Sequence, residues 1–154
     1  MKILIVDDQL PNRLIAKFLV DNNIQVMGHI GLTPQTAKEF KVQGKDEETA
    51  NKLIKLAKEC DDAGCFSLVL ECVPLDLAKK ITESISIPTI GIGAGPDCDG
   101  QVLVCNDMVG LYDKFSPKFA KRYADLGKYM KVAFENYVKE VKEGKFPEDK
   151  HSFH

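Results

Sequence analysis

The chain alternates short apolar runs with longer amphipathic segments, a pattern typical of an α/β protein with a parallel sheet. Apolar runs predict strands near residues 3–6, 24–30, 65–73, 87–92 and 101–105. Apolar residues at helical spacing predict helices near residues 11–21, 46–63, 74–85 and 117–143. The run at 65–73 is almost wholly apolar, which indicates a parallel strand covered by helices on both faces.

Residues with known preferences for helix ends mark several of these boundaries. Asp46 is placed to cap the N-terminus of the second helix, and Gly64 is placed to end it. Pro117 suits the first turn of the last helix. These positions separate the elements clearly and leave no convincing linker, so we predict one domain that spans residues 1–154.

Five strand–helix units fit a flavodoxin-like sheet with strand order 2-1-3-4-5 and helices on both faces. The chain has 154 residues, fewer than the roughly 200 of a complete eight-stranded TIM barrel. The alternative is an open half of such a barrel, with the consecutive order 1-2-3-4-5. We favour the flavodoxin-like order because it covers both faces of the sheet. A monomer is expected for that order, and a dimer for the open half barrel, whose inner apolar face would otherwise be exposed.

The composition of the chain limits the partners that we expect and the cellular compartment in which we expect the protein. The formal net charge of −2 and the pI near 5.9 give no reason to expect nucleic acid as a partner. No apolar run approaches the roughly 18 residues of a membrane span, so we expect a cytoplasmic protein that does not bind membranes. The five cysteines include no Cys-x-x-Cys pair and lie far from the three histidines in sequence. Disulfides and zinc sites are therefore not expected.

Most of the chain, from about Val20 to Phe153, resembles ketopantoate hydroxymethyltransferase. Five motifs in the order of that family carry the resemblance: Val26–Gln35, Lys41–Lys45, Leu68–Pro74, Ile87–Gly95 and Lys121–Asp125. In the family these motifs belong to barrel strands five to eight and the helices that follow them. The resemblance therefore covers the second half of a TIM-barrel enzyme.

The resemblance implies roles for individual residues. Glu71 matches the catalytic base, which takes a proton from C3 of 3-methyl-2-oxobutanoate, and His29 matches a histidine that lines the substrate site. Gly91, Gly93 and Gly95 match a glycine run near that site. In the family, Mg²⁺ holds the 2-oxo acid as a Lewis acid, and its aspartate ligands lie on strands that have no counterpart here. The resemblance therefore implies that the chain by itself has no hydroxymethyltransferase activity.

The first nineteen residues resemble a different family, the receiver domains of response regulators. Asp7 and Asp8 match the acidic pair that binds Mg²⁺ in those domains. The same two carboxylates could instead end a strand and favour the N-terminus of the next helix. Glu71 stands where a receiver domain has its phosphoacceptor aspartate, so phosphotransfer is not expected.

Taken together, the two resemblances favour an engineered or chimeric protein without catalytic activity. It would bind a divalent cation weakly at the carboxyl edge of the sheet, through Asp7, Asp8 and Glu71, or a small anion at the same edge near the glycine run. No cofactor would be required, and Mg²⁺ would bind weakly. Two alternatives stay open: a fragment of the hydroxymethyltransferase that transfers a one-carbon unit from methylene-tetrahydrofolate with a complementary half, and a degenerate receiver domain.

Overall fold

The computed structural model describes residues 3–7, 12–34, 37, 39–112 and 114–154. The chain forms two compact units, Met1–Val102 and Leu103–His154, and each is described by itself. The single domain expected from the sequence stays a prediction.

The first unit is built on a parallel sheet. Its four longer strands are β1 (Ile3–Asp7), β2 (Gln25–Gly31), β3 (Ser67–Glu71) and β4 (Thr89–Ile92). The two-residue segment Gly100–Gln101 (β5) pairs with β4 at one edge. Neighbours in the sheet follow chain order, β1-β2-β3-β4-β5, and every pair is parallel. The prediction of an α/β fold with a parallel sheet is therefore confirmed.

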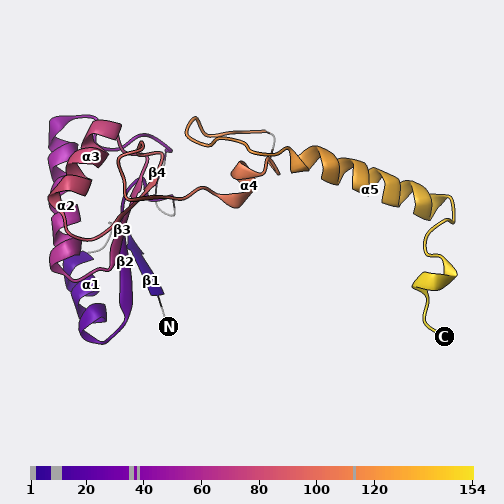
Figure 1. The fold of residues 1–154 in the computed structure, drawn as a ribbon, viewed down its shortest axis with the longest axis horizontal. Coiled ribbons are helices and arrows are strands. Elements are labelled where there is room, and N and C mark those ends of the chain that lie inside the picture. Colours follow the sequence, from indigo (N-terminus) through magenta and orange to yellow (C-terminus); the bar gives the residue numbers. More distant parts are fainter. Residues whose placement is uncertain (1–2, 8–11, 35–36, 38, 113) are drawn as a thin grey trace. The chain divides into compact units, whose positions relative to one another are not determined.

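The helices of this unit lie on one face of the sheet. They are α1 (Asn12–Asp21), α2 (Glu47–Asp62) and α3 (Leu75–Ser84), and α2 contacts both of the others (Figure 1). The predicted strand order 2-1-3-4-5 with helices on both faces is therefore wrong, and the alternative order 1-2-3-4-5 is found. In this order every new strand is added at the same edge of the sheet. Because each crossover is right-handed, all the connecting helices then lie on the same face. This is the arrangement of an open half barrel.

Local sequence accounts for the bounds of α2. The backbone N–H of Thr49 donates to Oδ1 of Asp46 at 2.9 Å, so Asp46 is the N-cap as predicted. Hydrogen bonds from Thr49 also lower the pKa of the Asp46 carboxyl. At the other end Gly64 has φ of +84°, and its N–H donates to the carbonyl of Asp61 at 2.9 Å. The helix thus ends where the glycine was expected to end it.

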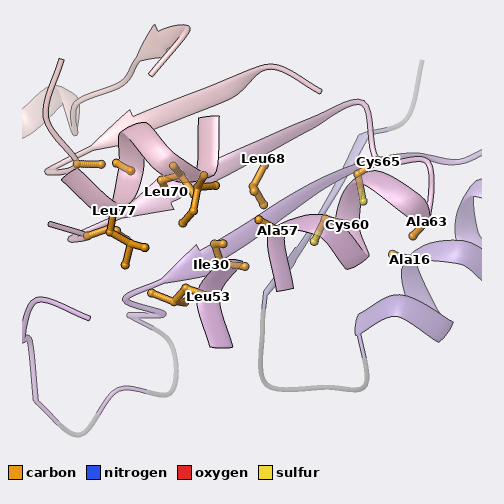
Figure 2. Close-up of a cluster of buried hydrophobic side chains, with 14 of the residues drawn as sticks. Ala16, Ile30, Leu53, Ala57, Cys60, Ala63, Cys65, Leu68, Leu70 and Leu77 are labelled. Carbon is orange, nitrogen blue, oxygen red and sulfur yellow. The ribbon is translucent and has the colours of Figure 1, made fainter. Parts of the chain in front are cut away.

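The core of the first unit lies between the sheet and the helices (Figure 2). From β3, Leu68 and Leu70 are completely buried there, while Val69 between them points to the other face and is half-buried. The near-continuous apolar run of β3 thus has only one face covered by helices, and the predicted cover on both faces is wrong. The uncovered face is where the candidate site lies.

The second unit consists of α4 (Cys105–Met108), α5 (Leu126–Lys142) and the 3₁₀ turn η1 (Asp149–His151). The last long helix begins at Leu126, so the predicted start at Pro117 is wrong. The N–H of Tyr123 donates to the carbonyl of Met108 at 2.8 Å, and the N–H of Leu126 to that of Val109 at 3.0 Å. Because these N–H groups bond to carbonyls at the end of α4, they are not available for helical hydrogen bonds to residues four positions earlier, and residues 117–125 do not continue α5. Within the described ranges, no helix is both long enough and apolar enough to cross a membrane.

Asp99 secures the start of β4 and should make the stability of the first unit depend on pH. Its Oδ2 accepts from the backbone N–H of the completely buried Thr89 at 2.8 Å and from the Thr89 hydroxyl at 3.0 Å. These bonds hold the pKa of the Asp99 carboxyl below its usual 3.8. The folded state therefore binds a proton at Asp99 less readily than the unfolded state does. The hydrogen bonds of the Asp99 carboxylate stabilise the fold fully above pH 3.8, and this stabilisation is lost as the pH falls through the lowered pKa of the folded state.

We therefore expect Asp99→Asn to remove part of the loss of stability that the wild-type protein shows below about pH 4. Urea unfolding followed by circular dichroism, repeated down to about pH 2, measures this dependence. Thr89→Val is the control, because it removes the hydroxyl but keeps the backbone N–H and should retain a reduced part of the effect. An Asp99→Asn protein with the pH dependence of wild type would contradict the assignment.

Candidate functional site

A histidine and a glutamate meet near the carboxyl ends of two neighbouring strands. His29 in β2 is paired in register with Val69 in β3, and Glu71 follows two residues later on the same face. Nε2 of His29 lies 3.1 Å from Oε2 of Glu71, a hydrogen-bonding distance. Both side chains are largely buried, with 9% and 16% of their surface exposed. The parallel pairing of β2 with β3 thus brings together two residues that are 42 positions apart in the chain.

The pair lies in a hollow of about 600 Å³ on the uncovered face of the sheet. Its lining residues come from all four longer strands and from the segment after β5: Ile5, Met27, His29, Val69, Glu71, Ile90, Ile92 and Val102. Among these lining residues, His29 and Glu71 carry the polar side chains. An apolar hollow with a few convergent polar groups is the usual form of a small-molecule site.

The backbone of Glu71 is held from both neighbouring strands. Its carbonyl accepts from the N–H of Leu32 at 2.8 Å, and the N–H of Cys72 donates to the carbonyl of Ile92 at 2.9 Å. Gly31 has φ of +99°, and a Cβ at that position would overlap the carbonyl oxygen of Glu71. The absence of a side chain at residue 31 therefore allows β2 and β3 to approach closely where the glutamate is presented.

This arrangement suits general-base chemistry. With its proton on Nε2, the His29 ring donates to Oε2 of Glu71, a tautomer that we assign from the hydrogen bond. The second carboxylate oxygen, Oε1, can then accept a proton from a molecule bound in the hollow. Burial and the neighbouring Glu71 charge raise the pKa of the Cys72 thiol, so this cysteine is not activated as a nucleophile.

The three glycines predicted to lie near the substrate do not all belong to one element: Gly91 lies within β4, whereas Gly93 and Gly95 lie in the segment that follows it. Gly91 lies in β4 beside Leu70 of β3, and a Cβ on it would meet Sγ of Cys98 at 3.0 Å. Cys98 packs against the core beneath the helices. A side chain at position 91 would therefore point toward the helices and not into the hollow. Gly93 and Gly95 have φ of +66° and +82°, conformations that favour glycine. These three glycines have structural reasons for their presence, and their role in substrate binding stays a prediction.

The predicted metal ligands fall at the limit of the described chain. Asp7 ends β1 and is paired in register with His29, whereas Asp8 lies outside the described residues. In the parts of the chain that the structure describes, no three His, Cys, Asp or Glu residues are grouped so as to hold a metal ion. The described residues therefore do not by themselves provide the ligands for the Mg²⁺ that the resemblance implies, and no step of the proposed reaction depends on that ion. Weak Mg²⁺ binding by Asp7 and Asp8 stays a prediction.

His29 and Glu71 were each predicted from the sequence, but the hydrogen bond between them was not. A signal was available, because both residues come at the ends of apolar runs that were predicted to be parallel strands. If those two strands are neighbours, the side chains reach the same edge of the sheet. The predicted order 2-1-3-4-5 placed another strand between them, which concealed the pair. The apolar lining was also missed, because the face that it occupies was expected to be covered.

The fold and the site define an α/β protein with an apolar hollow at the carboxyl ends of its strands, the edge at which many α/β enzymes bind their ligands. The chain belongs to the ketopantoate hydroxymethyltransferase family, whose family model matches residues 11–149. This match includes α1, most of which lies in the predicted receiver-like segment of the first nineteen residues. The comparisons give no support to a receiver fusion or to a chimera.

Two relatives show how far the likeness extends. The 3-methyl-2-oxobutanoate hydroxymethyltransferase of Carboxydothermus hydrogenoformans is 62% identical over 143 residues, which cover 91% of this chain and 51% of that protein. The enzyme of the same name from Clostridium botulinum (strain Alaska E43 / Type E3) is 59% identical over 140 residues, 89% of this chain and 51% of that protein. The chain thus spans about half the length of these relatives.

Among solved structures, the YdjI aldolase from Escherichia coli K12 is similar with a TM-score of 0.41 and 18% identity. The match covers 70% of this chain and 46% of that chain. A likeness at this level adds nothing to the description of the fold or the site.

Proposed function

We propose that this chain carries the half of a 3-methyl-2-oxobutanoate hydroxymethyltransferase site that holds the base, and that turnover needs the residues of the other half. The observation that carries the proposal is the 3.1 Å contact between His29 and Glu71 in the hollow at the strand ends. In the resemblance stated above, these two residues match the catalytic base and a histidine of the substrate site. The relatives are named for their action on 3-methyl-2-oxobutanoate, so we take a branched 2-oxo acid as the substrate class.

In the proposed reaction, Glu71 removes the proton from C3 of 3-methyl-2-oxobutanoate. Oε1 of the carboxylate takes the proton, and the electron pair of the C–H bond becomes the double bond of an enolate. C3 of the enolate then forms a bond to the methylene carbon of methylene-tetrahydrofolate, and the two C–N bonds that hold this carbon to the folate break. Water supplies the hydroxyl group of the product. The second proton of this water and the proton taken up by Glu71 pass to the two nitrogens, so tetrahydrofolate leaves. His29 supports the removal of the C3 proton by fixing the carboxylate through its hydrogen bond to Oε2.

The hollow offers contacts that suit such a substrate. Its walls near the pair include Val69 of β3 and Ile92 of β4, apolar side chains that could pack against two methyl groups. The hollow is open on the face without helices, so a bound molecule would remain in contact with water. A second set of strands over this face would exclude that water and strengthen the electrostatic interactions within the site.

The proposal keeps the expectation that this chain is inactive by itself. The relatives are about twice as long as the matched segment, and the described residues here do not group three metal ligands. The consecutive strand order is also the one for which we expected a dimer, because the apolar face would otherwise be exposed to water. That dimer stays a prediction. The remaining half of a relative would cover the same face.

A complementation experiment tests the proposal. We expect the purified chain to show no conversion of 3-methyl-2-oxobutanoate with methylene-tetrahydrofolate and Mg²⁺. Added to a polypeptide that contains the first half of the Carboxydothermus relative, the chain should give Mg²⁺-dependent product, measured by chromatography of the hydroxymethylated acid. The expected reason is that the added strands cover the hollow and supply the missing ligands.

The positive control joins the same two halves in one polypeptide, which shows whether they are compatible. Conversion by the chain alone would contradict the need for a second half. Absence of conversion by the joined protein, if circular dichroism shows that it is folded, would contradict the assignment of the base to this chain.

A further inference from the structure

Two cysteines lie at the turn that ends α2. The N–H of Cys65 donates to the carbonyl of Cys60 at 3.1 Å, and the N–H of Gly64 donates to that of Asp61 at 2.9 Å. Gly64 between them has φ of +84°. These features define a Schellman motif, in which the side chains of the first and last residues of the turn characteristically contact each other. In this chain both of those residues are cysteines.

The backbone hydrogen bonds of this motif bring residues 60 and 65, and with them the two thiol side chains, next to each other. The Cys60 side chain is hydrogen-bonded to Cys65, and this bond is the main reason why the pKa of the Cys65 thiol is lowered from its usual value of 9.0. Both residues are thiols in the structure, and Figure 2 shows them in the part of the core near Ala63. Burial instead raises the pKa values of the Cys72 and Cys98 thiols. A lower pKa favours the thiolate, which is the reactive form of cysteine.

The pair is buried but lies just beneath the surface. Cys60 and Cys65 are 5% and 2% exposed, whereas Asp62, Gly64 and Phe66 of the same turn are exposed. Opening of a single helix end requires less free energy than unfolding of the whole unit, because fewer buried contacts are lost. Local opening of this turn would uncover both thiols without unfolding the sheet.

We propose that Cys60 and Cys65 form a dithiol site that a low-molecular-weight disulfide, such as oxidised glutathione, converts to an intrachain disulfide. The Cys65 thiolate attacks one sulfur of glutathione disulfide, the S–S bond breaks, and the first glutathione leaves as a thiolate that takes up a proton. The Cys60 thiol then loses its proton to water and attacks the Cys65 sulfur, which releases the second glutathione. Two protein thiols are oxidised and one glutathione disulfide is reduced to two glutathione thiols.

The geometry of the turn suits this product. The backbone hydrogen bond between Cys65 and Cys60 holds the two residues close enough for side-chain rotation to bring the sulfur atoms to the disulfide bond length of about 2.05 Å. A disulfide here would join the end of α2 to the residues just before β3, which are already held together by the backbone hydrogen bonds of the turn. The folded state should therefore accept the bond without a change of fold.

The test uses the full chain, reduced and then incubated with oxidised glutathione. Peptide mapping by mass spectrometry without reduction should find a peptide in which Cys60 and Cys65 are joined, lower in mass by two hydrogen atoms. Dithiothreitol should restore the thiols. In a Cys60→Ser variant the second step is impossible, so Cys65 should instead retain a glutathione adduct.

Cys105→Ser is the matched control, because Cys105 is exposed and belongs to the second unit. This variant should form the Cys60–Cys65 bond as wild type does. The proposal is overturned if Cys105 of the wild type becomes glutathionylated while Cys60 and Cys65 remain thiols. It is also overturned if wild type and Cys60→Ser carry the same adduct on Cys65. Circular dichroism of each variant shows that the fold is kept, and none of these readouts depends on transferase activity.

Discussion

Replacing Glu71 by glutamine should lower kcat of the complemented enzyme by about 10²–10⁴-fold, the usual contribution of a positioned general base. Glutamine keeps the shape of the side chain and can still accept a hydrogen bond from His29, but it cannot take the C3 proton. We therefore expect KM for 3-methyl-2-oxobutanoate to change little. Initial rates over a range of substrate concentrations, with the complementary half in excess, separate the two parameters.

Glu83→Gln is the matched control for this substitution. Glu83 lies exposed in α3, on the side of the sheet opposite the hollow, so the same chemical change there should leave kcat unaltered. A Glu71→Gln enzyme with the kcat of the Glu83→Gln enzyme would show that another group takes the proton. An exchange assay gives a second reading, because Glu71→Gln should also stop the exchange of the C3 hydrogen with deuterated water.

The local elements of this fold could be predicted from the sequence because their determinants are local. Asp46 caps α2 through its neighbour Thr49, and Gly64 ends the same helix with a positive φ that other residues adopt at a cost. The start of α5 was not predictable in this way. It depends on hydrogen bonds from Tyr123 and Leu126 to carbonyls at the end of α4, and no pattern within the helix indicates them.

The order of the strands could not be read from the sequence for a related reason. In both the flavodoxin-like sheet and the half barrel, each unit is an apolar strand followed by an amphipathic helix. The difference lies in which edge of the sheet receives β2, and that choice is made by contacts between distant residues. The apolar run of β3 suggested burial on both faces, but an open half barrel has the same composition, because its inner face becomes core once a second half covers it.

The chemistry of the candidate site was predicted in part. Resemblance to the family pointed to both His29 and Glu71, and the structure brings them within 3.1 Å of each other. The hydrogen bond itself required the pairing of β2 with β3, which the predicted order lacked. The expected carboxylate cluster at the strand ends is a different case, since Asp8 lies outside the described residues and the prediction stays open.

Replacing Gly31 by alanine should lower the free energy of unfolding of the first unit by about 2–5 kcal/mol. About 1–2 kcal/mol comes from placing an L-residue at a φ of +99°. A further 1–3 kcal/mol, roughly, comes from moving the carbonyl of Glu71 away from the added methyl group. All four tyrosines lie beyond Val102, so their fluorescence reports on the second unit. Hydrogen exchange of the β2 and β3 amides is therefore the better measurement.

Gly64→Ala separates the two contributions. Its φ of +84° imposes a similar backbone cost, but a Cβ there would meet only the flexible Val20 side chain, at 3.2 Å. We expect this variant to lose about 1–2 kcal/mol. Equal losses in the two variants would mean that β2 and β3 do not approach as closely at Glu71 as the structure has them. If the approach is real, Gly31→Ala should also displace the Glu71 carboxylate and reduce the activity of the complemented enzyme, whereas Gly64→Ala should preserve it.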